Sequence, residues 1–244
     1  YNDSTAKLYT DCGIFTCKES IGEDATAVFN MLSGYSEPRS WNELILAPYW
    51  LRDKFLYLIK REIKHVKEGK EGRIAAKMNS LCDSGIIAAL YEASAAGVKI
   101  DLIVRGICCL KVGIPGVSEN ITVRSIVGNF LEHSRIFYFE NGGNIDVYMG
   151  SADWMPRNLD RRVEIIFPVL EDALKEKAVH ILEVELADNV KARVMEPDGN
   201  YVRVDKRGKQ LVNSQRVFVE EAEQAVPKDT ESQRGRVFIP AEPL

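Results

Sequence analysis

Residues 73–106, R-I-A-A-K-M-N-S-L-C-D-S-G-I-I-A-A-L-Y-E-A-S-A-A-G-V-K-I-D-L-I-V-R-G, decide the fold. Both ends of this stretch are short apolar segments typical of strands, whereas residues 83–97 have the apolar spacing of a helix and end at Gly97. A strand, a helix and a second strand in this order form a β-α-β crossover, which places two parallel strands in a sheet covered by helices. The stretch therefore predicts an α/β fold.

The same alternation of strands and helices extends to both sides of this stretch. On the amino-terminal side it predicts a helix over 23–34, a strand over 44–48 and a helix over 50–69. On the carboxy-terminal side the predicted elements are strands over 120–127, 134–139, 145–151 and 161–169, a helix over 171–186 and a hairpin around Asn200. We expect one mixed sheet flanked by helices.

The composition excludes several classes of protein. A formal net charge of −4 argues against a protein that coats nucleic acid or anionic lipid through its overall charge, so any anion site is expected to be local. The longest apolar runs are far too short to cross a bilayer, and we expect no transmembrane segment. Five cysteines without a C-x-x-C spacing indicate neither a disulfide framework nor a zinc site. Reduced, mostly buried thiols in a cytosolic protein are the expectation.

Side chains would have to bind phosphate in this protein, because neither G-x-x-x-x-G-K-[ST] nor G-x-G-x-x-G occurs in the chain. Arg105 and Lys77 each stand at the end of a predicted strand, where α/β sheets gather the groups that contact ligands. Each could be an ordinary strand-end cation. Two such cations in adjacent β-α units favour phosphate binding by both.

The stretch F-L-E-H-S-R-I-F-Y-F, residues 130–139, places His133 and Arg135 two residues apart. Alternate residues of a strand share a face, so the imidazole and the guanidinium would point the same way. This arrangement suits proton transfer or nucleophilic attack beside a fixed cation. The alternative is an edge-strand histidine next to a surface arginine, which is the more frequent case for an isolated H-x-R.

A second polar stretch, G-S-A-D-W-M-P-R-N-L-D-R-R-V-E, residues 150–164, is rich in groups that can donate hydrogen bonds to an anion. The strand predicted at its end would place Arg162 and Glu164 on one face, which favours a deliberate pair. The alternative is a solvated loop with ordinary surface charges.

Six segments between Tyr1 and about Gln215 closely resemble the bacterial polyphosphate kinase family, in the same order. They are YNDSTAKLYTD, KMNSL, DLIVRGICCL, GVSENITVRSIV, FLEHSRIFYFENGG and GSADWMPRNLDRRVE. The resemblance implies a phospholipase D-like catalytic half made of two related α/β domains, each a mixed sheet flanked by helices. Residues 1–43 would be the end of the first domain, residues 44–215 the second domain, and residues 216–244 a peripheral carboxy-terminal tail.

The resemblance also implies an activity. Enzymes of this family transfer the γ-phosphoryl group of ATP to a histidine and then to polyphosphate, reversibly and with Mg²⁺. The family's phosphorylated histidine precedes the YNDSTAK segment, in a stretch that this chain lacks, so we expect the chain alone to be nearly inactive. ATP, ADP and polyphosphate would be the partners, without nucleic acid. For the full-length protein we expect a cytoplasmic homo-oligomer, with membrane association as an alternative.

The resemblance also implies roles for individual residues. His133 matches the second active-site histidine, a general acid or base toward the leaving oxygen. Arg105 and Arg162 match arginines that hold phosphates, and Arg135 stands where phospholipase D-like enzymes have the lysine of H-x-K. Glu164, from its position beside Arg162, would orient an imidazole. No residue is assigned to a metal ion.

Two other functions stay open. A phospholipase D-like phosphodiesterase is disfavoured, because the chain has a single H-x-R segment and lacks the lysine of H-x-K. A non-catalytic module could use the same arginines to bind polyphosphate or RNA, although no RNP-type motif supports RNA binding.

Overall fold

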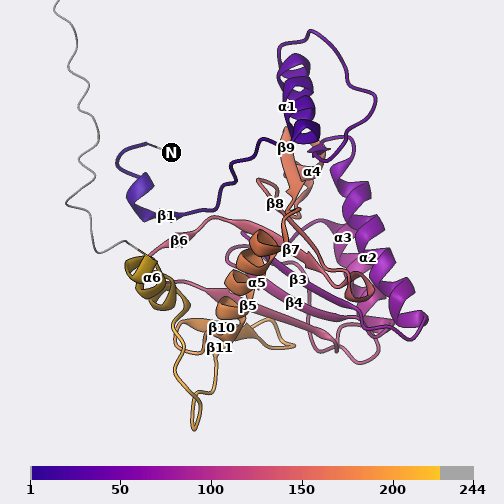
Figure 1. Ribbon diagram of the computed structural model, residues 1–244. Coiled ribbons are helices and arrows are strands. Elements are labelled where there is room, and N and C mark those ends of the chain that lie inside the picture. Colours follow the sequence, from indigo (N-terminus) through magenta and orange to yellow (C-terminus); the bar gives the residue numbers. More distant parts are fainter. Residues whose placement is uncertain (1, 226–244) are drawn as a thin grey trace, which may run out of the picture.

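The computed structural model describes residues 2–225 (Figure 1). Its central feature is a nine-stranded sheet in the order β11-β10-β5-β4-β3-β7-β8-β9-β2. The strands are β2 (Ile45–Ala47), β3 (Arg73–Met78), β4 (Lys99–Val104), β5 (Ile121–Ile126), β7 (Arg135–Phe139), β8 (Asp146–Gly150), β9 (Glu164–Pro168), β10 (Ala192–Met195) and β11 (Tyr201–Arg203). β3, β4 and β5 are parallel and the other neighbours antiparallel, so the predicted mixed sheet is confirmed.

The predicted β-α-β crossover lies at the centre of this sheet. β3 and β4 run parallel, and α3 (Ser84–Ala95) connects them. This helix begins where the Asp83 carboxylate accepts a hydrogen bond of 3.0 Å from the Ile86 N–H. It ends just before Gly97, whose φ of 98° lets the chain turn back toward the sheet. Local sequence therefore fixes both ends of the crossover helix.

Helices cover both faces of the sheet, because successive residues of a strand point in opposite directions. On one face Ile74 and Ala76 of β3 belong to the core beneath α2 (Leu51–Lys67) and α3. On the other face Ala75 belongs to the core beneath α5 (Asp172–Ala187). Figure 1 shows α5 on the side of the sheet opposite α2 and α3.

Three further α-helices belong to the described part. α1 (Glu19–Leu32) is anchored by the buried Asp24 carboxylate, which accepts the Leu44 N–H at 2.8 Å. α4 (Pro156–Asp160) interrupts the polar stretch before β9, and α6 (Ser214–Ala225) includes the first residues of the expected tail. The rest of that tail, residues 226–244, lies outside the described residues. None of the helices between residues 2 and 225 combines the length and apolar character that a bilayer span requires.

Two predicted strands begin later than the sequence indicated. The strand predicted around His133 is interrupted: β6 (Leu131–Glu132) ends before it, and β7 begins only at Arg135. The interruption arises because β6 leaves the main sheet to pair with β1 (Tyr9–Thr10), parallel and in register. The strand predicted from residue 161 begins at Glu164, because α4 and the turn after it occupy the preceding residues.

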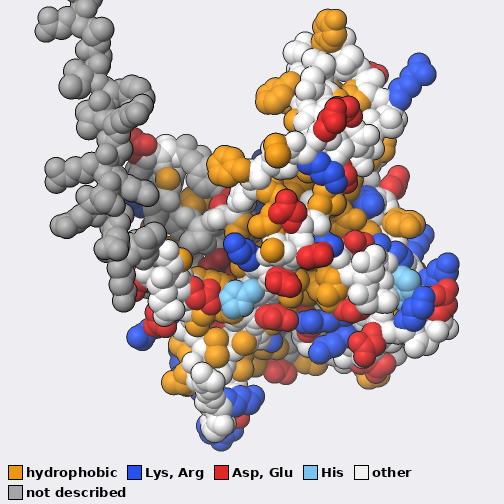
Figure 2. Space-filling model, in the orientation of Figure 1, with side chains coloured by type: hydrophobic (Ala, Val, Ile, Leu, Met, Phe, Trp, Pro, Cys, Tyr) orange, Lys and Arg blue, Asp and Glu red, His pale blue; other side chains and the backbone are white. Residues whose placement is uncertain are grey.

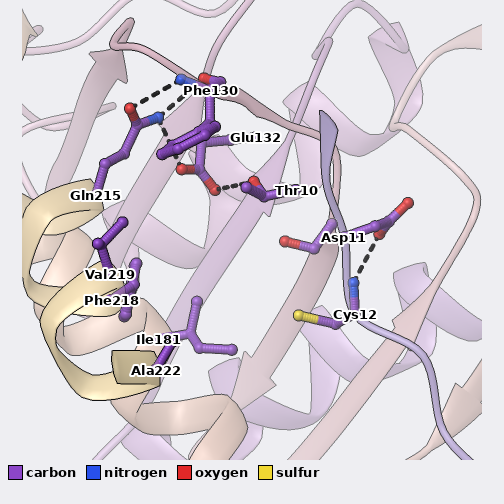
Figure 3. A pocket seen from close by; sticks show the side chains of 11 residues that line it. Thr10, Asp11, Cys12, Phe130, Glu132, Ile181, Gln215, Phe218, Val219 and Ala222 are labelled. Atoms are coloured by element: carbon purple, nitrogen blue, oxygen red, sulfur yellow. Dashed lines mark hydrogen bonds between the residues drawn. The ribbon is translucent and has the colours of Figure 1, made fainter. Parts of the chain in front are cut away.

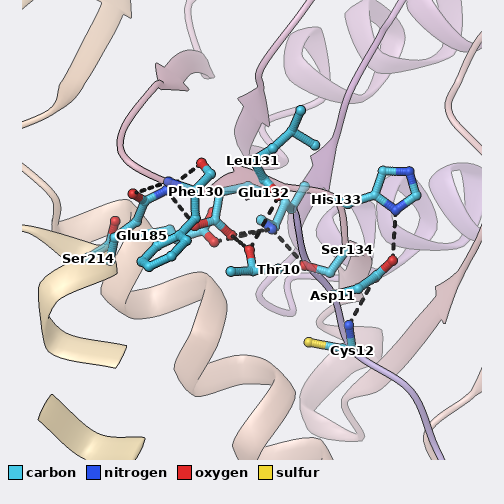
Figure 4. Close-up of polar contacts among 12 residues, drawn as sticks. Thr10, Asp11, Cys12, Phe130, Leu131, Glu132, His133, Ser134, Glu185 and Ser214 are labelled. Carbon is cyan, nitrogen blue, oxygen red and sulfur yellow. Dashed lines mark hydrogen bonds and ion pairs between the residues drawn. The ribbon is translucent and has the colours of Figure 1, made fainter. Parts of the chain in front are cut away.

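A buried charged cluster lies between this β1–β6 strip and α5 (Figure 4). Lys77 of β3, whose side chain is 3% exposed, lies 3.2 Å from Glu132 and 3.3 Å from Glu185. Its Nζ also donates to Ser134 at 2.6 Å. Both Glu185 oxygens are buried without a hydrogen-bond partner, so the contact with Lys77 is an ion pair without hydrogen-bond geometry. The cluster holds the strip against the core, but it leaves the Glu185 carboxylate poorly solvated.

This cluster makes the stability of the fold depend on pH. Burial raises the pKa of Glu185 to about 7; Lys77 opposes this shift and Glu132 adds to it. Because the folded protein holds a proton that the unfolded chain releases near pH 4.5, the free energy of unfolding should fall as pH rises from about 4.5 to 7. At about 1.4 kcal/mol per pKa unit the loss is about 3 kcal/mol at most.

Denaturant unfolding at half-unit pH steps measures this loss in the natural chain and in Glu185→Gln, in which it should disappear. Glu183→Gln, the same change at an exposed position of the same helix, serves as the control. An identical pH slope in Glu185→Gln and the natural chain would contradict the assignment.

On the opposite face of the sheet, the stability of the core depends on an aromatic cluster. The Phe137 ring lies 4.7 Å from Phe55 and 5.3 Å from Trp154, measured between centroids, and all three side chains are buried. Phe137→Ala should lower the free energy of unfolding by roughly 3–5 kcal/mol, because the cavity left in the core cannot collapse. Phe29→Ala, at a position that is 73% exposed, should change it by less than about 0.5 kcal/mol. Equal effects in denaturant unfolding would show that Phe137 is not a core anchor.

Candidate active site

The ends of four central strands bring several of the predicted site residues to one edge of the sheet. Arg105 follows β4, and Arg135 is the first residue of β7. Because β7 runs antiparallel to β3 and β8, it starts at the edge where β3, β4 and β8 end. His133 precedes β7 by two residues and lies at the same edge.

The amino-terminal segment holds the His133 imidazole (Figure 4). Nδ1 of His133 lies 2.7 Å from Oδ2 of Asp11, and the Tyr9 ring meets the imidazole edge to face with centroids 5.2 Å apart. The backbone N–H of His133 also donates to the backbone carbonyl of Thr10 at 2.9 Å. The carboxylate assigns the proton to Nδ1, which makes Nε2 the nitrogen able to exchange a proton with a ligand.

Arg135 is locked in place beside this imidazole. Its Nε donates to Oδ1 of Asp153 at 3.1 Å, and its guanidinium also donates to the His133 carbonyl. The same Asp153 oxygen accepts the Asn79 N–H at 2.9 Å. Asp153 therefore orients the guanidinium and offsets part of its charge.

Arg105 lies half-buried close to Arg135 and forms no ion pair among the described residues. Burial lowers the pKa of Arg105 and the charge of Arg135 lowers it further, whereas Asp153, Tyr9 and Glu132 raise it. Its Nε is buried and, within residues 2–225, has no hydrogen-bond partner. A desolvated donor beside a second guanidinium is unfavourable until an anion satisfies both.

A cavity opens beside His133 and Arg135, with a volume of 490 Å³, which is in the range of small-molecule sites. Its lining residues are Asp11, Cys12, His133, Arg135, Met149, Gly150, Ser151, Val163, Ile165 and Phe167. The predicted same-side arrangement of His133 and Arg135 is therefore present, although the two residues do not share one strand. Acidic and basic side chains are interspersed on the face shown in Figure 2.

Arg162 and Glu164 do not form the predicted pair. Arg162 is exposed and lies before β9, whereas Glu164 is buried and accepts hydrogen bonds from Ser151 and Asn158. The prediction of a shared strand face is wrong because β9 begins only at Glu164. The carboxylate that contacts the His133 imidazole is Asp11.

Lys77 and Arg135 point to opposite faces of the sheet. Lys77 points to the α5 face, where Glu132 and Glu185 offset its charge. Arg135 points instead to the face where Asp153 lies. The convergence of Lys77 and Arg105 on one anion stays a prediction, and the two carboxylates beside Lys77 argue against it.

A second cavity, of 380 Å³, lies between the β1–β6 strip and helices α5 and α6 (Figure 3). Ile181, Phe218, Val219 and Ala222 give it a largely apolar wall. Its polar groups bond mainly one another: Gln215 Nε2 donates to Glu132 at 2.9 Å. With carboxylates and no unpaired cation on its wall, this cavity does not suit a phosphate.

The residues described here do not form a magnesium site of their own. Within residues 2–225 no group of three or more acidic, histidine or cysteine side chains could hold a metal ion. Asp11 and Asp153, two carboxylates at this edge, contact His133 and Arg135.

Sequence reasoning missed the residues that position the site. Tyr9, Asp11, Asn79 and Asp153 fix the imidazole and Arg135, yet no spacing rule marks them. Asp11 and His133 are separated by 122 positions, so the contact has no local signal. Tyr9 and Asp11 do lie in the YNDSTAKLYTD segment, and its resemblance to a known family was the one available indication.

Comparisons with known proteins match most of this chain. The family model described as "Polyphosphate kinase C-terminal domain 2" matches residues 44–215, and "Polyphosphate kinase C-terminal domain 1" matches residues 1–38. The polyphosphate kinase of Lactiplantibacillus plantarum is 50% identical over 98% of this chain and 34% of its own length. That of Synechocystis is 52% identical over 95% of this chain and 32% of its own length.

A solved structure supports the same assignment. The crystal structure of polyphosphate kinase from Porphyromonas gingivalis superposes with a TM-score of 0.82 at 41% identity, covering 86% of this chain and 33% of that one. The chain thus spans about a third of the length of these relatives. From the family models and these identities, the chain belongs to the polyphosphate kinase family.

Proposed function

We propose that the protein containing this chain transfers a phosphoryl group between ATP and the end of polyphosphate. One observation carries the proposal: Arg105 is half-buried beside Arg135, with an unpartnered Nε, next to an imidazole oriented by a carboxylate. A loose phosphoryl-transfer transition state spreads negative charge over peripheral oxygens, and fixed guanidinium groups stabilise that charge. The names of the relatives support this reaction.

The geometry suggests a role for each residue at this edge. His133 would exchange a proton through Nε2 with the leaving or attacking oxygen, and Asp11 would hold the ring in the required orientation. Arg105 and Arg135 would bind the phosphoryl oxygens. Arg162, exposed next to the cavity-lining Val163, would meet phosphates farther out along the chain. No phosphate contact is assigned to Lys77.

The covalent step would need a histidine from another part of the protein. His65 lies 3.3 Å from Asn141 at the opposite edge of the sheet, and His180 pairs with Glu221 on the surface. His133 is thus the imidazole of this chain to which we assign the role of acid or base, and its contact with Asp11 supports that assignment. We infer a phosphohistidine intermediate on a residue outside the chain, and an inactive isolated chain.

Mg²⁺, a homo-oligomeric state and a cytoplasmic location stay predictions from the resemblance. A magnesium ion bound to the phosphates of ATP would neutralise part of their charge. The residues described here assign no ligand to it.

In the full-length protein, His133→Ala should lower the rate of polyphosphate synthesis from ATP by roughly 10²–10⁴-fold, because a positioned general acid or base contributes about that much. His180→Ala is the matched control, since it removes another imidazole that pairs with a carboxylate, at 2.8 Å. The control should keep the natural rate. A His133→Ala enzyme within twofold of the natural rate would assign His133 to structure.

Asp11→Asn extends this test to the positioning of the ring. The amide keeps the size of the side chain but loses the negative charge at Nδ1. We expect a lower turnover number, a changed pH profile and an unchanged KM for ATP. A change in KM alone would place Asp11 in substrate binding.

Removing the arginines should weaken phosphate binding in a fixed order. Arg105→Ala should raise the Kd for polyphosphate roughly 10- to 100-fold, since hydrogen bonds to charged groups contribute about 1.5–3 kcal/mol. Arg162→Ala should have a smaller effect because its side chain is exposed to solvent. Lys64→Ala should leave the Kd almost unchanged, because the Lys64 side chain on α2 is 74% exposed. If titrations at two salt concentrations gave the same change in Kd for all three variants, a local phosphate site would be ruled out.

A further inference from the structure

Cys82 and Cys109 occupy facing positions in the loops that follow β3 and β4. All five cysteines are reduced here and none is fully buried, so the expectation of mostly buried thiols is wrong. Leu81 and Cys108 form an isolated parallel bridge. The Leu81 N–H donates to the Ile107 carbonyl and the Cys109 N–H to the Leu81 carbonyl, both at 2.8 Å. The two loops therefore lie side by side like parallel strands.

This register makes Cys82 and Cys109 the next facing pair. Neighbouring strands are about 5 Å apart, and a disulfide joins Cα atoms about 4.4–6.8 Å apart. The pKa of Cys82 agrees with this register: burial raises it, and the neighbouring Cys109 thiol raises it further. Cys108 instead packs against the core, with Sγ 4.0 Å from the Leu110 carbonyl.

We propose that Cys82 and Cys109 are a reversible oxidation site, which forms an intramolecular disulfide when the protein meets a peroxide. The Cys109 thiol loses its proton, and the thiolate attacks one peroxide oxygen; the O–O bond breaks, a sulfenic acid forms, and the departing hydroxide takes up that proton to leave as water. The Cys82 sulfur then attacks the Cys109 sulfur, the S–O bond breaks and a second water leaves. Two thiols and one hydrogen peroxide thus give one disulfide and two waters.

The surroundings of the two thiols determine which one reacts first. Cys109 is exposed and accessible to the oxidant, whereas Cys82 is partly covered. The raised pKa of Cys82 disfavours its thiolate and so makes it the poorer first nucleophile. Cys109 is therefore the attacking thiol and Cys82 the resolving one.

The disulfide would join the loop that carries Arg105 to the loop that carries Asn79. These loops already share two further backbone hydrogen bonds, from Arg105 N–H to the Met78 carbonyl at 3.3 Å and from Gly106 N–H to the Asn79 carbonyl at 2.7 Å. A disulfide between two loops that already lie side by side in the folded protein restricts the unfolded chain more than it strains the folded one. We expect the oxidised protein to keep its fold and unfold at a higher temperature.

The test uses the full-length protein treated with one equivalent of hydrogen peroxide, alkylated and digested with trypsin without reduction. Mass spectrometry should find residues 78–99 linked to residues 106–111, and dithiothreitol should release them. Cys82→Ser and Cys109→Ser should each abolish the link. Cys108→Ser, in the adjacent position, and Cys17→Ser, at another exposed cysteine, should preserve it.

Several results would overturn the proposal. They are the absence of the linked peptides in the natural protein, their persistence in Cys109→Ser, or links between separate molecules in place of the internal one. The midpoint of thermal unfolding gives a second measure, because it should rise on oxidation in the natural protein and stay constant in Cys82→Ser. Neither readout requires catalysis, so the outcome does not depend on the proposed function.

Discussion

The parallel pairing of β3 with β4 is the constraint on which the candidate site depends. Because α3 returns the chain to the start of the next strand, both strands end at the same edge of the sheet. The antiparallel strands β7 and β8 add the start of one strand and the end of another to that edge. Asn79, Arg105, Arg135 and Asp153 come from four different places in the sequence, and this pairing is what brings them together.

Charge balance differs among the strand-end cations of the central sheet. Asp153 offsets the charge of Arg135, whereas Arg105 has no ion pair among the described residues and is partly removed from water. Lys77 contacts both Glu132 and Glu185. Lys77 is therefore neutralised within the core, and Arg105 is not. In the function that we propose, Arg105 contacts a phosphate, so that a protein of net charge −4 binds a polyanion locally.

The β1–β6 strip connects the imidazole to the rest of the molecule. It brings Asp11 to His133, and the buried cluster around Lys77 holds the strip against α5. The facing thiols of Cys82 and Cys109 lie near the same edge, between the loops of Asn79 and Arg105. The candidate site therefore lies between a buried ion cluster on one side and the facing Cys82 and Cys109 on the other.

The sequence by itself determined the β-α-β crossover, the mixed sheet and most of its elements, because apolar periodicity and the capping residues Asp83 and Gly97 act over short distances. It also indicated His133, Arg105 and Arg135, which stand at strand ends. Only the tertiary structure decided that Asp11 orients the imidazole, that Lys77 turns to the other face, and that Arg162 and Glu164 separate. These outcomes depend on contacts between residues far apart in the chain and on burial, neither of which a local pattern encodes.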